Sequence, residues 1–206
     1  MTPEYSLFKD LNVSRETFSR LTTYVDLVKR WNPKINLVSR NSLSEIWERH
    51  IRDSVQVYRC ADEFRSWADL GSGGGFPGMV CAIMAADESP RARFSLVESD
   101  QRKSAFLRSV ARECGLDCKV ISKRIEAVDG LGADIVSARA LADLRTLLSF
   151  CDRHLSKNGT ALLPKGANWK KELGEAREEW NFDAEPITSL TEPQAVILKI
   201  KGVSRG

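Results

Sequence analysis

The sequence predicts an α/β protein whose mainly parallel β-sheet is closed by an antiparallel hairpin and preceded by a small helical extension. From residue 66 onward, short apolar runs alternate with stretches of helical period, which is typical of a parallel sheet covered by helices on both faces. Two further apolar runs, 183–187 and 195–201, have no helical stretch between them, which predicts the closing hairpin. The first 60 residues show helical periodicity alone. We therefore expect a helical extension at 1–62 that packs on one main domain at 63–206.

The extension is expected to contain two main helices. Ser14 is a candidate N-cap, and the apolar residues on either side of it have the spacing of a hydrophobic staple. Apolar residues then recur every three or four positions as far as Asn32-Pro33, where we expect this helix to end. Ser42 is the candidate N-cap of the second helix.

The main domain is expected to alternate strands with helices. The expected strands are 66–70, 93–98, 118–122, 134–137 and 159–164, and the expected helices are 77–86, 101–114, 143–154 and 169–178. In such sheets, ligands bind outside the carboxyl ends of the strands. Polar side chains gather at these ends, namely Asp69, Glu98, Ser122 and the segment 137–139. Their convergence predicts a single site.

A glycine-rich turn after the first strand is the strongest sign of a nucleotide-like ligand. Residues 69–78 read Asp-Leu-Gly-Ser-Gly-Gly-Gly-Phe-Pro-Gly, between an apolar run and a helical stretch. Glycine lets the backbone take positive φ and approach a ligand closely, and the following helix offers free N–H groups. Glu98 ends the next strand, where a carboxylate can bind ribose hydroxyls.

Two cofactors fit this turn. Residues 73–78 match the Gly-x-Gly-x-x-Gly fingerprint of NAD-dependent enzymes, with Glu98 near the expected spacing. Residues 69–75 match the acid-x-Gly-x-Gly-x-Gly pattern of methyltransferases that use S-adenosylmethionine (SAM). Asp69 separates the two, because an acid at this place suits a methionine ammonium group and lies awkwardly beside a pyrophosphate. SAM is therefore the expected cofactor.

The composition limits the class of protein further. The chain has 206 residues and 42% hydrophobic content, enough for one ordinary core, and its formal net charge is +3. It has no apolar run of membrane-spanning length and no secretory-signal pattern, so we expect a cytoplasmic protein without a membrane partner. Five cysteines without a C-x-x-C pair, and only two histidines, argue against disulfides and against a metal site. Six bases against two acids within 29–52 permit an RNA-facing surface.

Several short motifs lie along the chain. They are Trp31-Asn32-x-x-Ile35-Asn36-Leu37, Arg49-His50-Ile51-x-Asp53-Ser54, the turn 69–78, Glu98-Ser99, Lys103-x-x-Phe106-Leu107, Arg124-Ile125-Glu126, Ser137-x-Arg139-Ala140 and Pro164-Lys165-Gly166. With them, the chain resembles over roughly residues 14–200 the RsmG (GidB) family of bacterial 16S ribosomal RNA guanine-N7 methyltransferases. The Phe-Pro-Gly that follows the glycines is the most specific mark. The chain departs from the family at Ala138, because family members often have serine directly before the arginine; Arg139 is still the family arginine.

The resemblance implies a Rossmann-like, Class I SAM-dependent methyltransferase fold and an enzyme that methylates 16S rRNA, as naked RNA or within the small ribosomal subunit. We also expect a monomer. The residues expected to hold SAM are Asp69, Gly71, Ser72, Gly73, Gly75, Phe76, Glu98, Ser99, Ile125, Glu126 and Arg139. Arg139 and Lys165 are expected to act on the substrate, Arg139 through a fork that suits carboxylate or phosphate and Lys165 through one phosphate contact.

Several of these residues have structural alternatives. Glu98 can end a strand in solvent, Ile125 can belong to the core, Glu126 can cap or pair with Lys123, and Lys165 can be solvated. Arg139 can instead be an ion-pair partner of Asp69 or Glu98, and His50 is expected to pack or hydrogen-bond at a helix interface rather than to take part in chemistry.

The absence of two motifs known from other methyltransferases is consistent with methyl transfer to N7. The chain lacks the Asn/Asp-Pro-Pro-aromatic loop of amino-group methyltransferases, and no cysteine has the sequence context of a cytosine-C5 nucleophile. Guanine N7 carries a free lone pair and no proton, so positioning can suffice for catalysis. A small-molecule SAM-dependent methyltransferase, an NAD-dependent oxidoreductase and a non-enzymatic SAM-binding module remain alternatives at this point.

Overall fold

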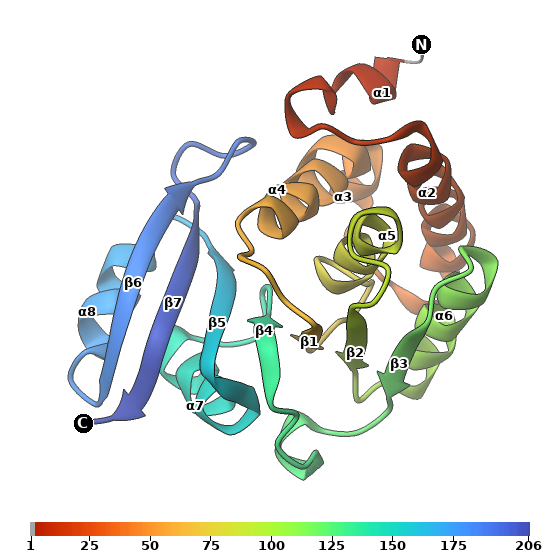
Figure 1. The fold of residues 1–206 in the computed structure, drawn as a ribbon. Helices are drawn as coiled ribbons and strands as arrows, with labels where there is room; N and C mark the ends of the chain where they lie inside the picture. The colour runs from red at the N-terminus through yellow and green to blue at the C-terminus, as the bar shows by residue number, and fades with distance from the viewer. Residues whose placement is uncertain (1–2) are drawn as a thin grey trace.

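The computed structural model describes residues 3–206, whose strands form one seven-stranded sheet in the order β3-β2-β1-β4-β5-β7-β6 (Figure 1). The strands are β1 Ser66–Leu70, β2 Arg93–Val97, β3 Cys118–Ile121, β4 Ala133–Ser137, β5 Leu155–Lys165, β6 Trp180–Thr188 and β7 Val196–Arg205. The first five strands pair in parallel, whereas β7 lies antiparallel between β5 and β6. The predicted sheet and its closing hairpin are confirmed.

Helices cover both faces of this sheet. They are α1 Pro3–Ser6, α2 Arg15–Ile35, α3 Arg40–Ser44, α4 Asp53–Arg59, α5 Gly78–Glu88, α6 Gln101–Glu113, α7 Leu144–His154 and α8 Trp169–Ala176. Helices α5 and α6 lie on one side of the sheet and α7 and α8 on the other, and α2 and α4 contact α5 (Figure 1). None of the helices within residues 3–206 combines the length and apolarity needed to cross a membrane.

Successive residues of the central strand β1 face opposite sides of the sheet, because side chains alternate along a strand. Trp67 belongs to the apolar cluster shared with α2, α4, α5 and α6, whereas Ala68 and Leu70 belong to the cluster shared with α7 and α8. Tyr24 of α2 is fully buried in the first cluster. The N-terminal helices therefore share a core with the sheet, and the boundary at residue 62 stays a prediction.

The first long helix begins where the sequence predicts but ends later. The hydroxyl of Ser14 accepts a hydrogen bond from the Thr17 N–H at 3.0 Å, which confirms the N-cap. Helix α2 then continues through Pro33, because a proline in the last turn removes a single helical hydrogen bond. Asn36 ends the helix in the left-handed conformation, with φ of 49°.

The prediction of Ser42 as the second N-cap is wrong. The cap is Ser39, whose hydroxyl accepts from the Ser42 N–H at 3.1 Å, so Ser42 lies inside α3. A π-helical segment, Trp47–Arg52, then joins α3 to α4 and carries His50. Such segments are rare and occur frequently at functional sites.

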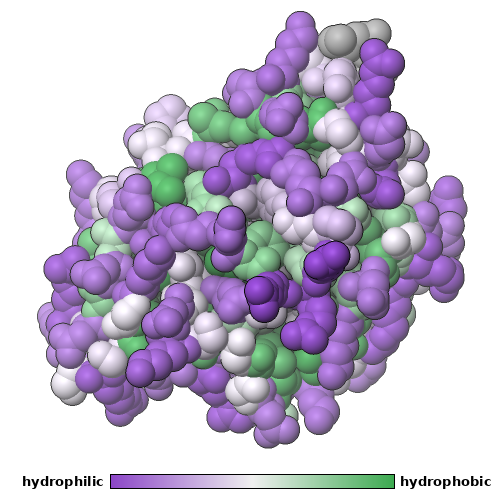
Figure 2. Space-filling view, viewed as in Figure 1, coloured by the Kyte–Doolittle hydropathy of each residue, from purple (hydrophilic) through white to green (hydrophobic). Residues whose placement is uncertain are grey.

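The strand ends also differ from the predicted ones. β5 begins at Leu155 rather than at residue 159, and the two strands of the hairpin extend beyond 183–187 and 195–201. The polar and charged residues of these outer segments break the apolar pattern, so periodicity alone could not include them. Figure 2 shows the molecule from the side of Figure 1 as a largely hydrophilic surface, with apolar atoms visible between polar side chains near its centre.

Candidate cofactor and substrate site

The glycine-rich turn borders a cavity of about 570 Å³ at the carboxyl ends of β1, β2 and β4. We call it the glycine-turn cavity. Most of the predicted cofactor residues line it, namely Gly71, Ser72, Gly73, Phe76, Glu98, Ser99, Ile125, Glu126 and Arg139. Asp69 and Gly75 do not line it, and neither does Lys165. The cavity is also lined by residues that were not predicted as site residues from the sequence, namely Leu37, Lys103, Lys123, Arg124, Leu141 and Phe150.

The turn itself depends on glycine and on a contact from the N-terminal helix. Gly71, Gly73 and Gly75 have φ of 65°, 53° and 96°, which residues with a side chain rarely adopt. The buried hydroxyl of Tyr24 donates to the Gly74 carbonyl at 2.5 Å. A Cβ on Gly75 would lie only 2.7 Å from that hydroxyl oxygen. Helix α2 therefore helps to fix the glycine-rich turn.

Glu98 joins the turn to the end of β2. One carboxylate oxygen accepts from the Gly73 N–H at 2.8 Å and the other from the Asp100 N–H at 2.7 Å. The residue is only 8% exposed, yet it lines the cavity. Because each carboxylate oxygen has two lone pairs, both oxygens keep the capacity to accept from a ligand hydroxyl.

Asp69 lies beneath the turn rather than in the cavity. The Trp67 indole N–H donates to the Ser137 hydroxyl at 2.8 Å, and that hydroxyl donates to Asp69 Oδ1 at 2.6 Å. Asp69 Oδ2 is buried and lacks a hydrogen-bond partner within residues 3–206. Burial raises the pKa of Asp69 to about 6, although the hydroxyls of Ser137 and Ser72 act to lower it. The structure thus gives Ser137 a clear partner and does not bring Asp69 to the cavity wall.

Arg139 lies against two rings. Its guanidinium contacts His50 Nδ1 at 2.9 Å and lies 5.2 Å from the centre of the Phe76 ring. The two rings stack on each other, with centroids 4.9 Å apart. Burial, then the charges of Arg139 and Arg49, lower the pKa of His50 to about 3, so this histidine is neutral and accepts from Arg139.

Arg139 does not form the ion pair with Asp69 or Glu98 that was its structural alternative. Within residues 3–206, Arg139 has no carboxylate within 4.0 Å, and neither Asp69 nor Glu98 pairs with it. His50 packs and hydrogen-bonds, as expected. Arg139 therefore keeps donors for a ligand while its aromatic neighbours hold its plane.

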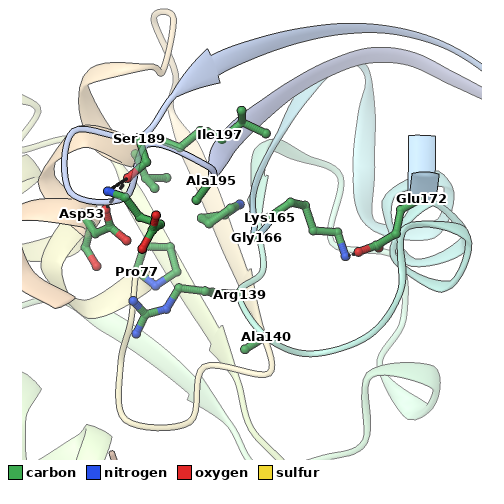
Figure 3. A pocket seen from close by; sticks show the side chains of 15 residues that line it. Asp53, Pro77, Arg139, Ala140, Lys165, Gly166, Glu172, Ser189, Ala195 and Ile197 are labelled. Carbon is green, nitrogen blue, oxygen red and sulfur yellow. Dashed lines mark hydrogen bonds and ion pairs between the residues drawn. The ribbon is translucent and has the colours of Figure 1, made fainter. Parts of the chain in front are cut away.

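A second cavity, of about 420 Å³, lies between α4, the end of β5 and the loop that joins β6 to β7 (Figure 3). We call it the hairpin cavity. Its walls are partly apolar, with Val57, Pro77 and Pro164 among the lining residues. Arg139 and Ala140 line both cavities, so the two meet at these residues. This arrangement can hold a cofactor and an acceptor side by side.

The structure does not present Lys165 as a free cation. Its Nζ lies 2.6 Å from a Glu172 carboxylate oxygen and donates to the Ala142 carbonyl at 3.0 Å. Figure 3 shows the side chain directed toward Glu172. The same Glu172 oxygen accepts from the Leu144 N–H at 2.9 Å. Lys165 therefore ties the segment after Arg139 to α7 and α8, and a phosphate contact would first have to break this ion pair.

The cysteines are poorly suited to nucleophilic attack. All five are free thiols, and burial raises the pKa of Cys60, Cys114 and Cys118 to about 11. A protonated thiol is a weak nucleophile at neutral pH. In the part of the chain that the structure describes, no three His, Cys, Asp or Glu side chains are grouped to hold a metal ion.

The sheet order, the closing hairpin, and the glycine turn with a carboxylate at the next strand end together define a class I SAM-dependent methyltransferase fold. Solved structures share it. A methyltransferase from Geobacter sulfurreducens aligns with a TM-score of 0.62 and 14% identity over 98% of this chain and 96% of that one. A SAM-dependent methyltransferase from Aquifex aeolicus gives a TM-score of 0.59 and 10% identity over 86% and 98% of the two chains.

The sequence comparisons identify the family within this class. The family model described as rRNA small subunit methyltransferase G (GidB) matches residues 17–199. A relative from Ruegeria pomeroyi named ribosomal RNA small subunit methyltransferase G is 65% identical over 195 residues, covering 95% of this chain and 96% of the relative. One of the same name from Paracoccus denitrificans is 50% identical over 94% of this chain and 98% of the relative. The chain belongs to this family, which is inconsistent with the oxidoreductase alternative.

Proposed function

We propose that this enzyme transfers the methyl group of SAM to N7 of a guanine in 16S ribosomal RNA. The observation that carries the proposal is the meeting of the glycine-turn cavity and the hairpin cavity at Arg139 and Ala140, in a chain of this family. A methyl transfer needs the donor sulfur and the acceptor atom close together and aligned. Two adjoining cavities with a shared wall supply that arrangement.

The glycine-turn cavity suits SAM in its chemistry. Glu98 offers carboxylate oxygens to the ribose hydroxyls, and the positive-φ glycines leave room for the ligand. Ile125, which is buried, and Glu126, which is exposed, both line this cavity, and the family resemblance implies that they lie near the adenine. Arg139 offers a fork to the methionine carboxylate. Asp69 supports the turn from beneath, since its backbone carbonyl accepts from the Ser72 hydroxyl at 3.0 Å and its carboxylate is held by Ser137.

Transfer to N7 asks little else of the protein. The N7 lone pair attacks the methyl carbon, the carbon–sulfur bond breaks, and the positive charge passes from the sulfonium to the base. No proton moves, so no general base is required. The two histidines are also poor candidates for a general base, because burial lowers the pKa of both His50 and His154.

RNA is supported as the substrate by the charges around the site. Lys103, Lys123 and Arg124 line the glycine-turn cavity, and none of them forms an ion pair with another residue of 3–206. Lys34 is exposed on the last turn of α2. Basic side chains without an ion-pair partner attract a phosphate backbone. We further propose that the enzyme acts as a monomer in the cytoplasm, where the small ribosomal subunit is found.

The product should be 7-methylguanosine. We expect the purified enzyme, given SAM and small ribosomal subunits from a strain that lacks the gene, to form this nucleoside in 16S rRNA. Nucleoside mass spectrometry of the digested RNA measures it, and mapping of the modified fragment gives its position. Because the transfer needs no catalytic general base, kcat should not change with pH above about pH 7. Methylated cytosine or adenine in place of 7-methylguanosine would overturn the proposal.

Replacing Glu98 by alanine should weaken SAM binding. The substitution removes an anionic acceptor from the ribose and releases the Gly73 N–H, so Kd is expected to rise about 10-fold or more. Isothermal titration calorimetry with SAM measures the change. Glu113→Ala is the matched control, because Glu113 is exposed at the end of α6 and pairs only with Arg112 in the described chain. Equal SAM affinity in Glu98→Ala and Glu113→Ala would show that the cofactor binds elsewhere.

A further inference from the structure

We infer that the hairpin cavity holds the acceptor guanine and that Asp53 recognises its Watson–Crick edge, an inference that rests on the proposed function. At about 420 Å³ the cavity is within the range of small-molecule sites, and enzymes that modify a base draw it out of its stack into such a pocket. The cavity meets the cofactor side at Arg139 and Ala140. A base seated in it would therefore lie next to the methyl donor.

The carboxylate of Asp53 is held with one oxygen available. Its Oδ1 accepts from the Thr191 hydroxyl at 2.5 Å and from the Ser189 hydroxyl at 3.2 Å, which occupies both lone pairs of that oxygen. Oδ2 has no hydrogen-bond partner among residues 3–206. Figure 3 shows Asp53 beside Ser189 at the cavity wall. The two hydroxyls thus fix the orientation of an acceptor that the protein itself leaves unused.

The loop that carries these hydroxyls is itself fixed to α4. The side-chain amide of Gln56 donates to the Thr188 carbonyl at 2.8 Å, and its oxygen accepts from the Leu190 N–H at 2.9 Å. Gln56 is buried. The geometry of Asp53 is therefore set before any ligand enters, and preorganisation of this kind favours selective binding.

The other charged groups of the cavity leave this role to Asp53. Glu172 is occupied by Lys165 at 2.6 Å, and Glu192 is exposed on the loop. Arg139 lies where the two cavities meet. The cavity therefore has a half-buried acceptor at α4 and a donor fork on its cofactor side.

Guanine is the base that complements this arrangement. Its Watson–Crick edge presents the N1–H and the N2 amino group, both donors, to a carboxylate, whereas adenine presents an acceptor at N1 and is repelled. N7 lies across the ring system from N2. An edge held by Asp53 therefore turns N7 away from α4, toward the wall formed by Arg139 and Ala140, where the cofactor cavity begins. Val57, Pro77 and Pro164 offer apolar surface to the ring faces.

The test compares guanine with inosine, which lacks only the N2 amino group. Small subunits carrying either nucleoside at the mapped position are methylated under single-turnover conditions by the wild type and by Asp53→Asn. We expect the wild type to act about 10-fold or more faster on guanine than on inosine, because one hydrogen bond to a charged acceptor is lost. Asparagine keeps an oxygen for Ser189 and Thr191 but places an amino group opposite the base. Asp53→Asn should therefore be slower on guanine, with a guanine-to-inosine ratio near one.

Glu192 also lines the hairpin cavity and is the competing acceptor, so Glu192→Gln is tested beside Asp53→Asn. Glu192→Gln should keep the wild-type ratio. If Asp53→Asn kept the wild-type ratio of guanine to inosine rates, or if only Glu192→Gln lost it, Asp53 would not be the residue that recognises guanine. Equal rates of the wild type on guanine and inosine would overturn the inference as well. Failure of the proposed function looks different, since the wild type would then form no 7-methylguanosine at all. Circular dichroism melting of Asp53→Asn checks that the fold is retained.

Discussion

Replacing Arg139 by alanine is expected to slow methyl transfer by about 10²-fold or more, a loss typical of a positioned charged group, while the fold is retained. The guanidinium lies where the two cavities meet, so both the cofactor and the acceptor depend on it. Its contacts with the protein are to a neutral ring nitrogen of His50, to the Arg49 carbonyl at 3.5 Å and to the Phe76 ring. No carboxylate ion pair is broken when it is removed, so the cost to stability should be small.

Single-turnover transfer and circular dichroism melting, measured on the same preparations, test this expectation. Arg145→Ala is the control, because Arg145 pairs with Glu178 and Glu179 and lines neither cavity. It should transfer methyl groups at close to the wild-type rate. If Arg139→Ala unfolds instead of remaining folded and inactive, Arg139 is a structural residue after all.

Replacing Gly78 by alanine is expected to cause the largest loss of stability. A Cβ at this position would lie 2.4 Å from Cβ and Cγ of Asp69, closer than real contacts allow. Asp69 is buried in β1 and is held by Ser137, so neither side can move away cheaply. We expect an overpacking cost of about 3 kcal/mol or more, at the upper end of such substitutions, together with a displaced cofactor turn.

Urea unfolding measures the effect, and another helical glycine provides the control. A Cβ on Gly174 in α8 meets nothing within 4 Å. Gly174→Ala should therefore stabilise the protein by about 0.5–1 kcal/mol, because alanine loses less conformational freedom in a helix. Similar unfolding midpoints for the two variants would show that the contact with Asp69 is not restrictive.

The sequence predicted the features that depend on local pattern. Alternating apolar runs located the parallel strands, and the glycine turn with Glu98 located the glycine-turn cavity, because a chain that forms such a sheet has to bring its strand ends together. Ser14 was predicted correctly because an N-cap acts within its own turn.

The features that depend on distant partners could not be predicted. Lys165 reads as an exposed cation beside a glycine, and only the packing of α8 brings Glu172 to it. Asp69 has the right spacing for a ligand contact, but its strand position directs it to Ser137 on the neighbouring strand. The capping role of Ser39 in place of Ser42 is a smaller case, since both are serines in a similar context.

The hydrogen bond from Tyr24 to Gly74 has a consequence for how this fold can be divided. A polypeptide that began at residue 63 would keep every strand and every glycine of the turn, but the Gly74 carbonyl would lose its buried donor. The hydroxyl also occupies the space next to Gly75, so its loss would leave a gap beside the turn. The cofactor turn is therefore completed by a helix that precedes the sheet in the chain. Grafting the sheet alone onto another protein would transfer the sequence motif without its geometry.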